Sequence, residues 1–297
     1  MSPQAQALPS RVAAAPDVPR MHAHGAAIPI IGFGTAMGWG GTGGGSEAAA
    51  AVTAALQAGC RHLDAARKYG TEKDVGIGIR QSGVPRDQIV VTTKVSHENL
   101  HANDFRRSTE ESLKELQLDY VDLLLVHWPN PKIPLKETLE ALARCKRDGL
   151  TRHVGVANFT TTLLDEAVAL SPEPLVCNQV EFHPYLDQRK IYAACRKHGM
   201  VLIGYCPFMR GGEVLNDPVV GEIARAKGRT PGQIILRWIT QHHGVGAIPR
   251  SVNPERIRQN LDIFDFSLDD DEMARISALR NNNKRRANPP HAPVWDT

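Results

Sequence analysis

Short apolar segments typical of β-strands alternate with helical segments along most of this chain of 297 residues. Several are almost continuous runs of β-branched residues and leucine, as strands covered on both faces are. They are Arg61–Ala66, Ile89–Val95, Val121–Trp128, His153–Ala157, Leu175–Val180, Met200–Tyr205 and, more weakly, Val245–Pro249 and Ile263–Phe266. Eight such segments, each followed by a helix and with no dividing linker, predict an α/β fold of one domain, the (β/α)8 or TIM barrel.

The N-terminal region departs from this alternation. Residues 1–24 contain many alanines and prolines and predict a flexible tail, so the barrel domain is expected over residues 25–297. The apolar run Ile28–Ile31 precedes the first helix and is expected in a hairpin that closes the floor of the barrel. Further along, Thr230–Gln233 offers an N-cap, a proline and a capping-box glutamine, which together predict a helix start.

The composition excludes several classes of protein. The chain has 35 Lys and Arg against 32 Asp and Glu, a net charge of +3. Nucleic acid and membrane surfaces usually require a larger basic excess, so neither partner is expected. The five cysteines form no CxxC pair and the twelve histidines show no ligand spacing, so we expect a reduced compartment and no metal site. No apolar run approaches the roughly 20 residues of a membrane helix. A cytoplasmic protein is therefore predicted.

Polar side chains stand at the ends of the predicted strands, where a buried apolar strand should carry none without a cause. They are Asp64 with Tyr69, Lys94, His127, Asn158, Gln179, Tyr205 and Arg250 with Ser251. The early ones recur about 30 residues apart, the length of one strand–helix unit. In a barrel the carboxyl ends of the strands meet on one face, and that face carries the chemistry. One active site is therefore predicted.

Four of these residues suit the polarisation of a carbonyl group. Tyrosine has an ordinary pKa of about 10, too high for easy proton donation at neutral pH. The ammonium of Lys94 would favour the phenolate of Tyr69, and Asp64 would pair with that ammonium. Neutral His127 could donate a hydrogen bond to the carbonyl oxygen. Because no serine or cysteine nucleophile stands beside a base, the missing reactant is a hydride, which implies a nicotinamide cofactor.

Two short patterns leave another fold open. Gly38–Gly43 matches GxGxxG and Tyr69–Lys73 matches YxxxK, which together indicate a doubly wound dinucleotide-binding reductase. The glycine match falls in a stretch so rich in glycine that a chance match is expected. The YxxxK pair also comes too early in the chain for that class, so the barrel is favoured.

Three separated motifs give the sequence a strong resemblance to the aldo-keto reductases. GCRHLDAARKYGTE (59–72), LQLDYVDLLLVHWP (116–129) and IPRSVNPERIRQN (248–260) are similar to the first, second and third signatures of that family. The likeness runs from about residue 25 to the end of the chain. It implies a monomeric, NADPH-dependent carbonyl reductase on a (β/α)8 barrel. Its catalytic tetrad falls on Asp64, Tyr69, Lys94 and His127.

The resemblance also implies the residues that bind NADPH or NADP+. They are Gly34, Thr35, Asp64, Ala157, Asn158, Gln179, Tyr205, Cys206, Phe208, Ile248, Arg250, Ser251, Val252, Arg256, Gln259 and Asn260. Tyr205 would stack on the nicotinamide ring. Arg250, Ser251 and Arg256 would hold the 2′-phosphate, where arginine is at least as good a phosphate ligand as the family's lysine. Ala157 stands where the family usually has serine, and Gln259 where it has glutamate.

Within the family, the C-terminal end of the chain resembles bacterial 2,5-diketo-D-gluconate reductases, including members that reduce methylglyoxal. Candidate walls of the substrate pocket are Trp39, Trp128, Phe208 and Trp295. The implied reaction reduces an aldehyde or ketone, with Tyr69 as the general acid. Two alternatives remain. The same site could oxidise a hydroxyl group of a sugar or secondary metabolite with NADP+, or the barrel could serve as a non-enzymatic redox sensor.

Overall fold

The computed structural model describes residues 18–36 and 44–296, and within them eight parallel strands form one sheet in the order β3 to β10. The strands are β3 (Phe33–Gly34), β4 (His62–Asp64), β5 (Val90–Val95), β6 (Val121–Val126), β7 (Thr151–Ala157), β8 (Leu175–Glu181), β9 (Val201–Tyr205) and β10 (Val245–Ala247). The sheet closes between its two edges, β3 and β10. Ile31, just before β3, forms a parallel bridge with Ala247 of β10, supported by a 2.9 Å hydrogen bond from Gly32 N to Ala247 O. The predicted (β/α)8 barrel is confirmed.

One predicted strand is wrong. The segment 263–266 forms no strand, and the place of the eighth strand is taken by β3, which is only two residues long. Ile263 is fully buried and the Phe266 ring lies 5.1 Å from the Arg229 guanidinium. The apolar side chains of this segment therefore pack among the outer helices, while β3 is too short to give a sequence pattern.

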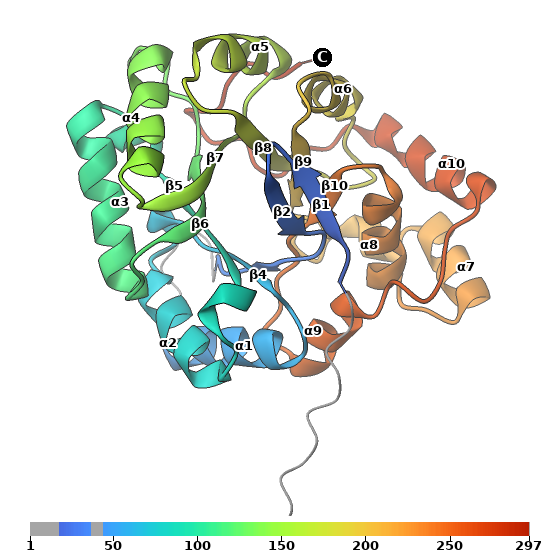
Figure 1. Cartoon of the computed structure of the whole chain (residues 1–297). Coiled ribbons are helices and arrows are strands. Elements are labelled where there is room, and N and C mark those ends of the chain that lie inside the picture. The colour runs from blue at the N-terminus through green and yellow to red at the C-terminus, as the bar shows by residue number, and fades with distance from the viewer. Residues whose placement is uncertain (1–17, 37–43, 297) are drawn as a thin grey trace, which may run out of the picture.

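The helices form an outer ring around the sheet (Figure 1). They are α1 (Ser46–Gln57), α2 (Glu72–Ser82), α3 (Ala102–Leu116), α4 (Leu135–Arg147), α5 (Thr161–Leu170), α6 (Arg189–Lys197), α7 (Pro218–Lys227), α8 (Pro231–Gln241), α9 (Pro254–Leu261) and α10 (Asp270–Ala278). Leu139 and Leu142 of α4 are fully buried against the sheet. The capping box of Thr230 and Gln233 is present at the start of α8. No helix in the described ranges is long and apolar enough to cross a membrane.

A hairpin covers the end of the barrel where the strands begin. Strand β1 (Arg20–Ala23) pairs with β2 (Ala26–Pro29), and Figure 1 shows the hairpin across the ring of strands. Met21 and Ile28 are buried with barrel residues such as Leu123. The hairpin predicted at the floor is therefore present. Residues 20–23, which were expected in the flexible tail, form strand β1 instead.

Candidate active site

A buried ion pair lies at the carboxyl ends of two adjacent strands. Lys94 of β5 donates from Nζ to Oδ1 of Asp64 on β4 at 2.6 Å, and to the carbonyl of Ala65 at 2.8 Å. The side chains of Lys94 and Asp64 are 0% and 1% exposed. Gln179 of β8 donates to the other carboxylate oxygen of Asp64 at 2.7 Å. The pair is thus fixed by charge and by hydrogen bonds from three strands, as a buried charge requires.

Tyr69 and His127 lie directly beside this ion pair. Tyr69 ends the short 3₁₀ helix η2 (Arg67–Tyr69), and its hydroxyl accepts a 3.4 Å hydrogen bond from Nζ of Lys94. His127 follows β6, and its ring meets the Tyr69 ring edge-on at 5.6 Å between centroids. The structure therefore brings the four residues of the predicted tetrad together on the face where the strands end.

Burial and the neighbouring charges together set the protonation of this cluster. Burial lowers the pKa of His127 well below its ordinary value, and the positive charge of Lys94 lowers it further, so the imidazole is neutral. Burial also acts on Lys94, but its contacts with Asp64 and Tyr69 outweigh it and raise the pKa of the ammonium. Burial raises the pKa of Tyr69, and Lys94 only partly opposes that rise. The expectation from the sequence rested on Lys94 and Asp64 and left out burial, which sets the net direction for the pKa of Tyr69.

A chain of hydrogen bonds continues from the tetrad to the next strands. Asn158 follows β7 with a φ of 64° and donates from Nδ2 to the carbonyl of His127 at 2.9 Å. The hydroxyl of Tyr205, at the end of β9, donates to Oδ1 of Asn158 at 2.7 Å. Two predicted nicotinamide contacts thus lie on the same face as the tetrad, and Gln179 reaches Asp64 itself.

Several residues expected to bind the cofactor lie between the end of β10 and α9. Arg250, Ser251 and Val252 precede the helix, and its N-cap Asn253 accepts bonds from two backbone N–H groups. Arg250 donates to the carbonyl of Ala36 at 2.6 Å. The other predicted residues on α9 are Arg256, Gln259 and Asn260. Arginines beside a helix N-terminus suit an anion such as a phosphate.

The remaining predicted cofactor residues lie in or next to the strands. Ala157 ends β7 and is buried inside the barrel, and Cys206 follows β9 with a φ of 52°. The hydroxyl of Thr35 is buried and donates to the carbonyl of Asp64 at 2.9 Å. It therefore supports the strand that carries Asp64. Gly34 of β3 and Ile248, which follows β10, lie side by side, since a Cβ on Gly34 would be 3.0 Å from the Ile248 carbonyl.

Two of the predicted pocket walls face each other beside His127. The rings of Trp128 and Trp295 meet at 6.0 Å. Phe208 follows β9, and its ring instead lies against Gly232 in the first turn of α8. Trp39 lies outside the described residues. His291 was not expected at this site, but its ring stacks on His97 at 3.7 Å and meets Trp128 at 5.4 Å. No sequence pattern indicates this pair, because the two histidines lie in segments without regular spacing.

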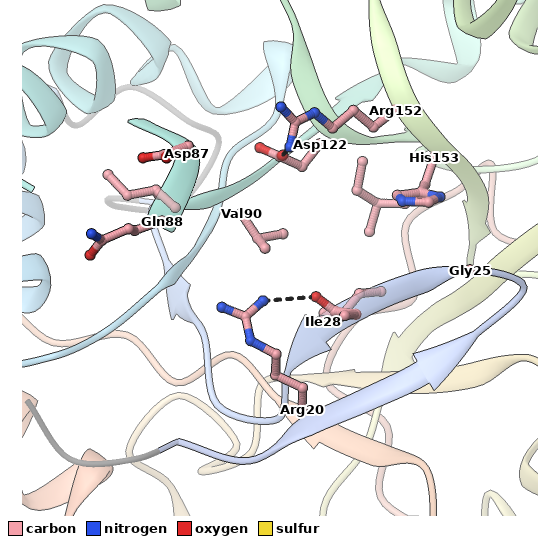
Figure 2. A pocket seen from close by; sticks show the side chains of 12 residues that line it. Arg20, Gly25, Ile28, Asp87, Gln88, Val90, Asp122, Arg152 and His153 are labelled. Atoms are coloured by element: carbon pink, nitrogen blue, oxygen red, sulfur yellow. Dashed lines mark hydrogen bonds and ion pairs between the residues drawn. The ribbon is translucent and has the colours of Figure 1, made fainter. Parts of the chain in front are cut away.

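A separate cavity of about 240 Å³ lies at the opposite end of the barrel, where the strands begin. Figure 2 shows Arg20 of the hairpin facing Asp122, Arg152 and His153 across it. Arg20 donates to the carbonyl of Ala27 at 3.0 Å. The tetrad does not line this cavity.

Comparison with known proteins agrees with this fold. The sequence model of the aldo/keto reductase family matches residues 30–281, and the chain belongs to this family. Glyoxal reductase of Bacillus subtilis is 40% identical over 245 residues, which cover 82% of this chain and 88% of that protein.

Solved structures show the same barrel. The crystal structure of a putative 2,5-diketo-D-gluconic acid reductase B superposes with a TM-score of 0.89 at 40% identity, covering 94% of this chain and 98% of that one. A Bombyx mori aldo-keto reductase in complex with NADP gives a TM-score of 0.86 at 33% identity, covering 93% of this chain and 99% of that one.

Proposed function

We propose that this protein reduces the carbonyl group of an aldehyde or ketone to an alcohol with NADPH. The observation that carries the proposal is the buried contact of Lys94 with both Asp64 and Tyr69, next to a neutral His127. This arrangement supplies a proton and a hydrogen bond to one oxygen atom. Family membership and the relative named glyoxal reductase support the same reaction.

The residues around the site fit a nicotinamide dinucleotide phosphate. Tyr205 offers a half-buried aromatic ring on the face of the tetrad, tied to Asn158. Arg250, Ser251 and exposed Arg256 offer cationic and hydroxyl donors for a phosphate at the start of α9. The structural relative from Bombyx mori was crystallised with NADP. When bound, the reduced nicotinamide supplies the hydride that forms the new C–H bond.

The chain's own residues then act on the substrate oxygen. Neutral His127 donates an N–H hydrogen bond that orients the carbonyl and draws electron density to its oxygen. The hydroxyl of Tyr69 transfers its proton to that oxygen, so the O–H bond of tyrosine breaks and that of the alcohol forms. The ammonium of Lys94 stabilises the phenolate left on Tyr69. Asp64 keeps Lys94 charged and in place.

We further propose that the substrates are small dicarbonyl compounds. We also propose that the protein is a monomer and that it acts in the cytoplasm. The relative named glyoxal reductase supports the substrate class. The residues that carry NADPH-dependent reduction would also carry its reverse, so the net direction depends on the ratio of NADPH to NADP+ and on the carbonyl and alcohol concentrations.

The test is the loss of NADPH absorbance with purified protein and a panel of carbonyls, namely methylglyoxal, phenylglyoxal, diketogluconate and a bulky ketone. We expect turnover with at least one of them and slower turnover of NADP+ with the matching alcohol. Faster oxidation of alcohols would establish the reverse direction. NADPH binding without turnover of any carbonyl or alcohol would support a redox-sensing barrel instead.

A further inference from the structure

The last residues of the described chain, 284–296, lie across the face where the strands end. We call this segment the C-terminal strap. It contacts Glu181 at the end of β8, Trp128 after β6 and Thr161 at the start of α5. Figure 1 shows the end of the strap beside α5. The strap therefore spans the loops around the tetrad.

One end of the strap is held by a buried carboxylate. Glu181 is 0% exposed, and its two oxygens accept hydrogen bonds from the backbone N–H groups of Arg286 at 2.7 Å and Ala287 at 2.8 Å. His183 Nε2 lies 2.8 Å from the same carboxylate. Burial alone would raise the pKa of Glu181, but these contacts outweigh it and lower the pKa. The contacts are thus charge-assisted, which makes them stronger than neutral ones.

The other end of the strap is held by a second carboxylate. Asp296 accepts hydrogen bonds from Thr161 N at 3.0 Å and Thr161 Oγ1 at 2.7 Å. Thr161 is the first residue of α5. The N-terminus of a helix attracts negative charge and has N–H groups without partners inside the helix. The carboxylate of Asp296 therefore attaches the strap to the N-terminus of α5, where a negative charge is favoured.

Between these two ends the strap presents its aromatic side chains to Trp128. Trp295 meets Trp128 edge-on, donates from Nε1 to Asn288 at 2.9 Å and lies 3.7 Å below the Arg285 guanidinium. His291 packs on Trp128 from another part of the strap. Trp128 is the neighbour of His127 in the sequence, so these rings stand next to the proposed reaction site.

We propose that Glu181 and Asp296 are positioning residues of the substrate pocket. They fasten the two ends of the strap, so that His291 and Trp295 form one wall beside Trp128 and select the carbonyl compounds that fit. Glu181 lies two positions beyond Gln179 on β8, on the same face of the strand. One strand therefore carries both the residue that fixes Asp64 and the residue that fixes the strap. The proposal rests on the proposed function, because it assigns the wall of that pocket.

Amide hydrogen exchange of the full-length protein tests the fastening without any assay of activity. We compare Glu181→Gln and Asp296→Ala with the control Asp269→Ala. Asp269 also caps a helix through its carboxylate, at 2.8 Å from Glu272 N, but it is the N-cap of α10. We expect exchange in the strap to become about tenfold faster in the first two variants and to stay unchanged in the control. Unchanged exchange in Asp296→Ala and in Glu181→Gln would overturn the proposal.

Steady-state kinetics with phenylglyoxal test the effect on the pocket. We expect Asp296→Ala to raise KM about fivefold while kcat and the Kd for NADPH change less than about twofold, because the lost interaction positions the wall and takes no part in the chemistry. A KM equal to that of the control Asp269→Ala would overturn the positioning role. If the unmodified protein reduces no carbonyl, the proposed function fails, while hydrogen exchange still decides whether the two carboxylates hold the strap.

Discussion

The two ends of the barrel contain the same three kinds of side chain, a carboxylate, a cation and a tyrosine, in different arrangements. Where the strands begin, Asp122 lies 2.7 Å from Arg86 and accepts a 3.0 Å bond from the backbone of Val91. Arg86 and Arg152 lie over the ring of Tyr120 at 4.5 Å and 4.3 Å. Where the strands end, Lys94 contacts both Asp64 and the hydroxyl of Tyr69.

The difference lies in what each cation can do. Arginine stays protonated in proteins and stacks well on aromatic rings, so the Tyr120 cluster is suited to hold strands together. Lysine is a compact charge on a flexible stem, and here it is fully buried against a phenol. Its charge therefore acts directly on the O–H bond of Tyr69. Burial and the choice of cation therefore distinguish the cluster around Tyr120 from the proposed catalytic cluster around Tyr69.

The largest expected effect comes from removing each tyrosine hydroxyl. Tyr69→Phe should lower kcat/KM for carbonyl reduction by about 10² to 10⁴, the contribution of a general acid. Tyr120→Phe loses only the 2.7 Å bond from Arg152 at the other end and should stay near the unmodified rate. NADPH consumption gives both rates, and quenching of protein fluorescence checks that Tyr69→Phe still binds NADPH. Turnover by Tyr69→Phe near the unmodified rate would remove Tyr69 from the mechanism.

The next effect concerns stability after loss of a cation. Lys94→Met leaves the carboxylate of Asp64 buried beside Gln179 alone, which should cost about 3 to 5 kcal/mol in the free energy of unfolding. Arg152 is half exposed and its nearest guanidinium nitrogen is 3.4 Å from Asp122, so Arg152→Met should cost less than about 1 kcal/mol. Urea unfolding measures both values. Equal losses of unfolding free energy in the two variants would show that depth of burial does not distinguish the cations at the two ends of the barrel.

Acid should weaken the fold through His62, the first residue of β4. Burial lowers its pKa from 6.5 to about 4, and Nε2 lies 2.9 Å from the hydroxyl of Thr92. The unfolded chain takes up this proton below pH 6.5, while the folded chain does so only near pH 4. Stability should therefore fall by about 3 kcal/mol between those two values and level off below them. Urea unfolding across this pH range should give a flatter profile for His62→Gln, and an unchanged profile would assign the loss to other groups.

The smallest expected effect tests whether Arg250 contacts the 2′-phosphate of NADPH. Arg250→Ala should weaken binding of NADPH about tenfold or more, because a charge-assisted contact is lost, and should leave NADH binding almost unchanged. Arg152→Ala, which removes a guanidinium from the other end of the barrel, should change neither. Fluorescence titration of the unmodified protein and both variants with both cofactors gives the six dissociation constants. Equal weakening of NADPH and NADH would contradict a role at the 2′-phosphate.

Strand patterns and polar strand ends made much of this arrangement predictable. The predicted segment Ile89–Val95 differs from β5 by one residue, and the four residues of the tetrad do meet. The two-residue strand β3 was not predictable, because so short a segment has no periodicity. The pKa of Tyr69 depends on burial by the whole fold, which no local pattern gives. Glu181 is a polar residue at the end of an apolar strand, like Gln179 two positions earlier, so the rule of polar strand ends could have identified it. Its contact with Arg286 could not be predicted, because the two residues lie far apart in the sequence.

The closure of the sheet also sets when the barrel can form during synthesis. Ile31 pairs with Ala247, so the first and last strands meet only after more than two thirds of the chain has left the ribosome. Contacts between such distant residues raise the contact order, and folding slows as the contact order rises. Until Ala247 emerges, the strands made earlier carry open edges that can pair with other chains. The N-terminal strands therefore depend on the C-terminal third of the protein for protection from aggregation.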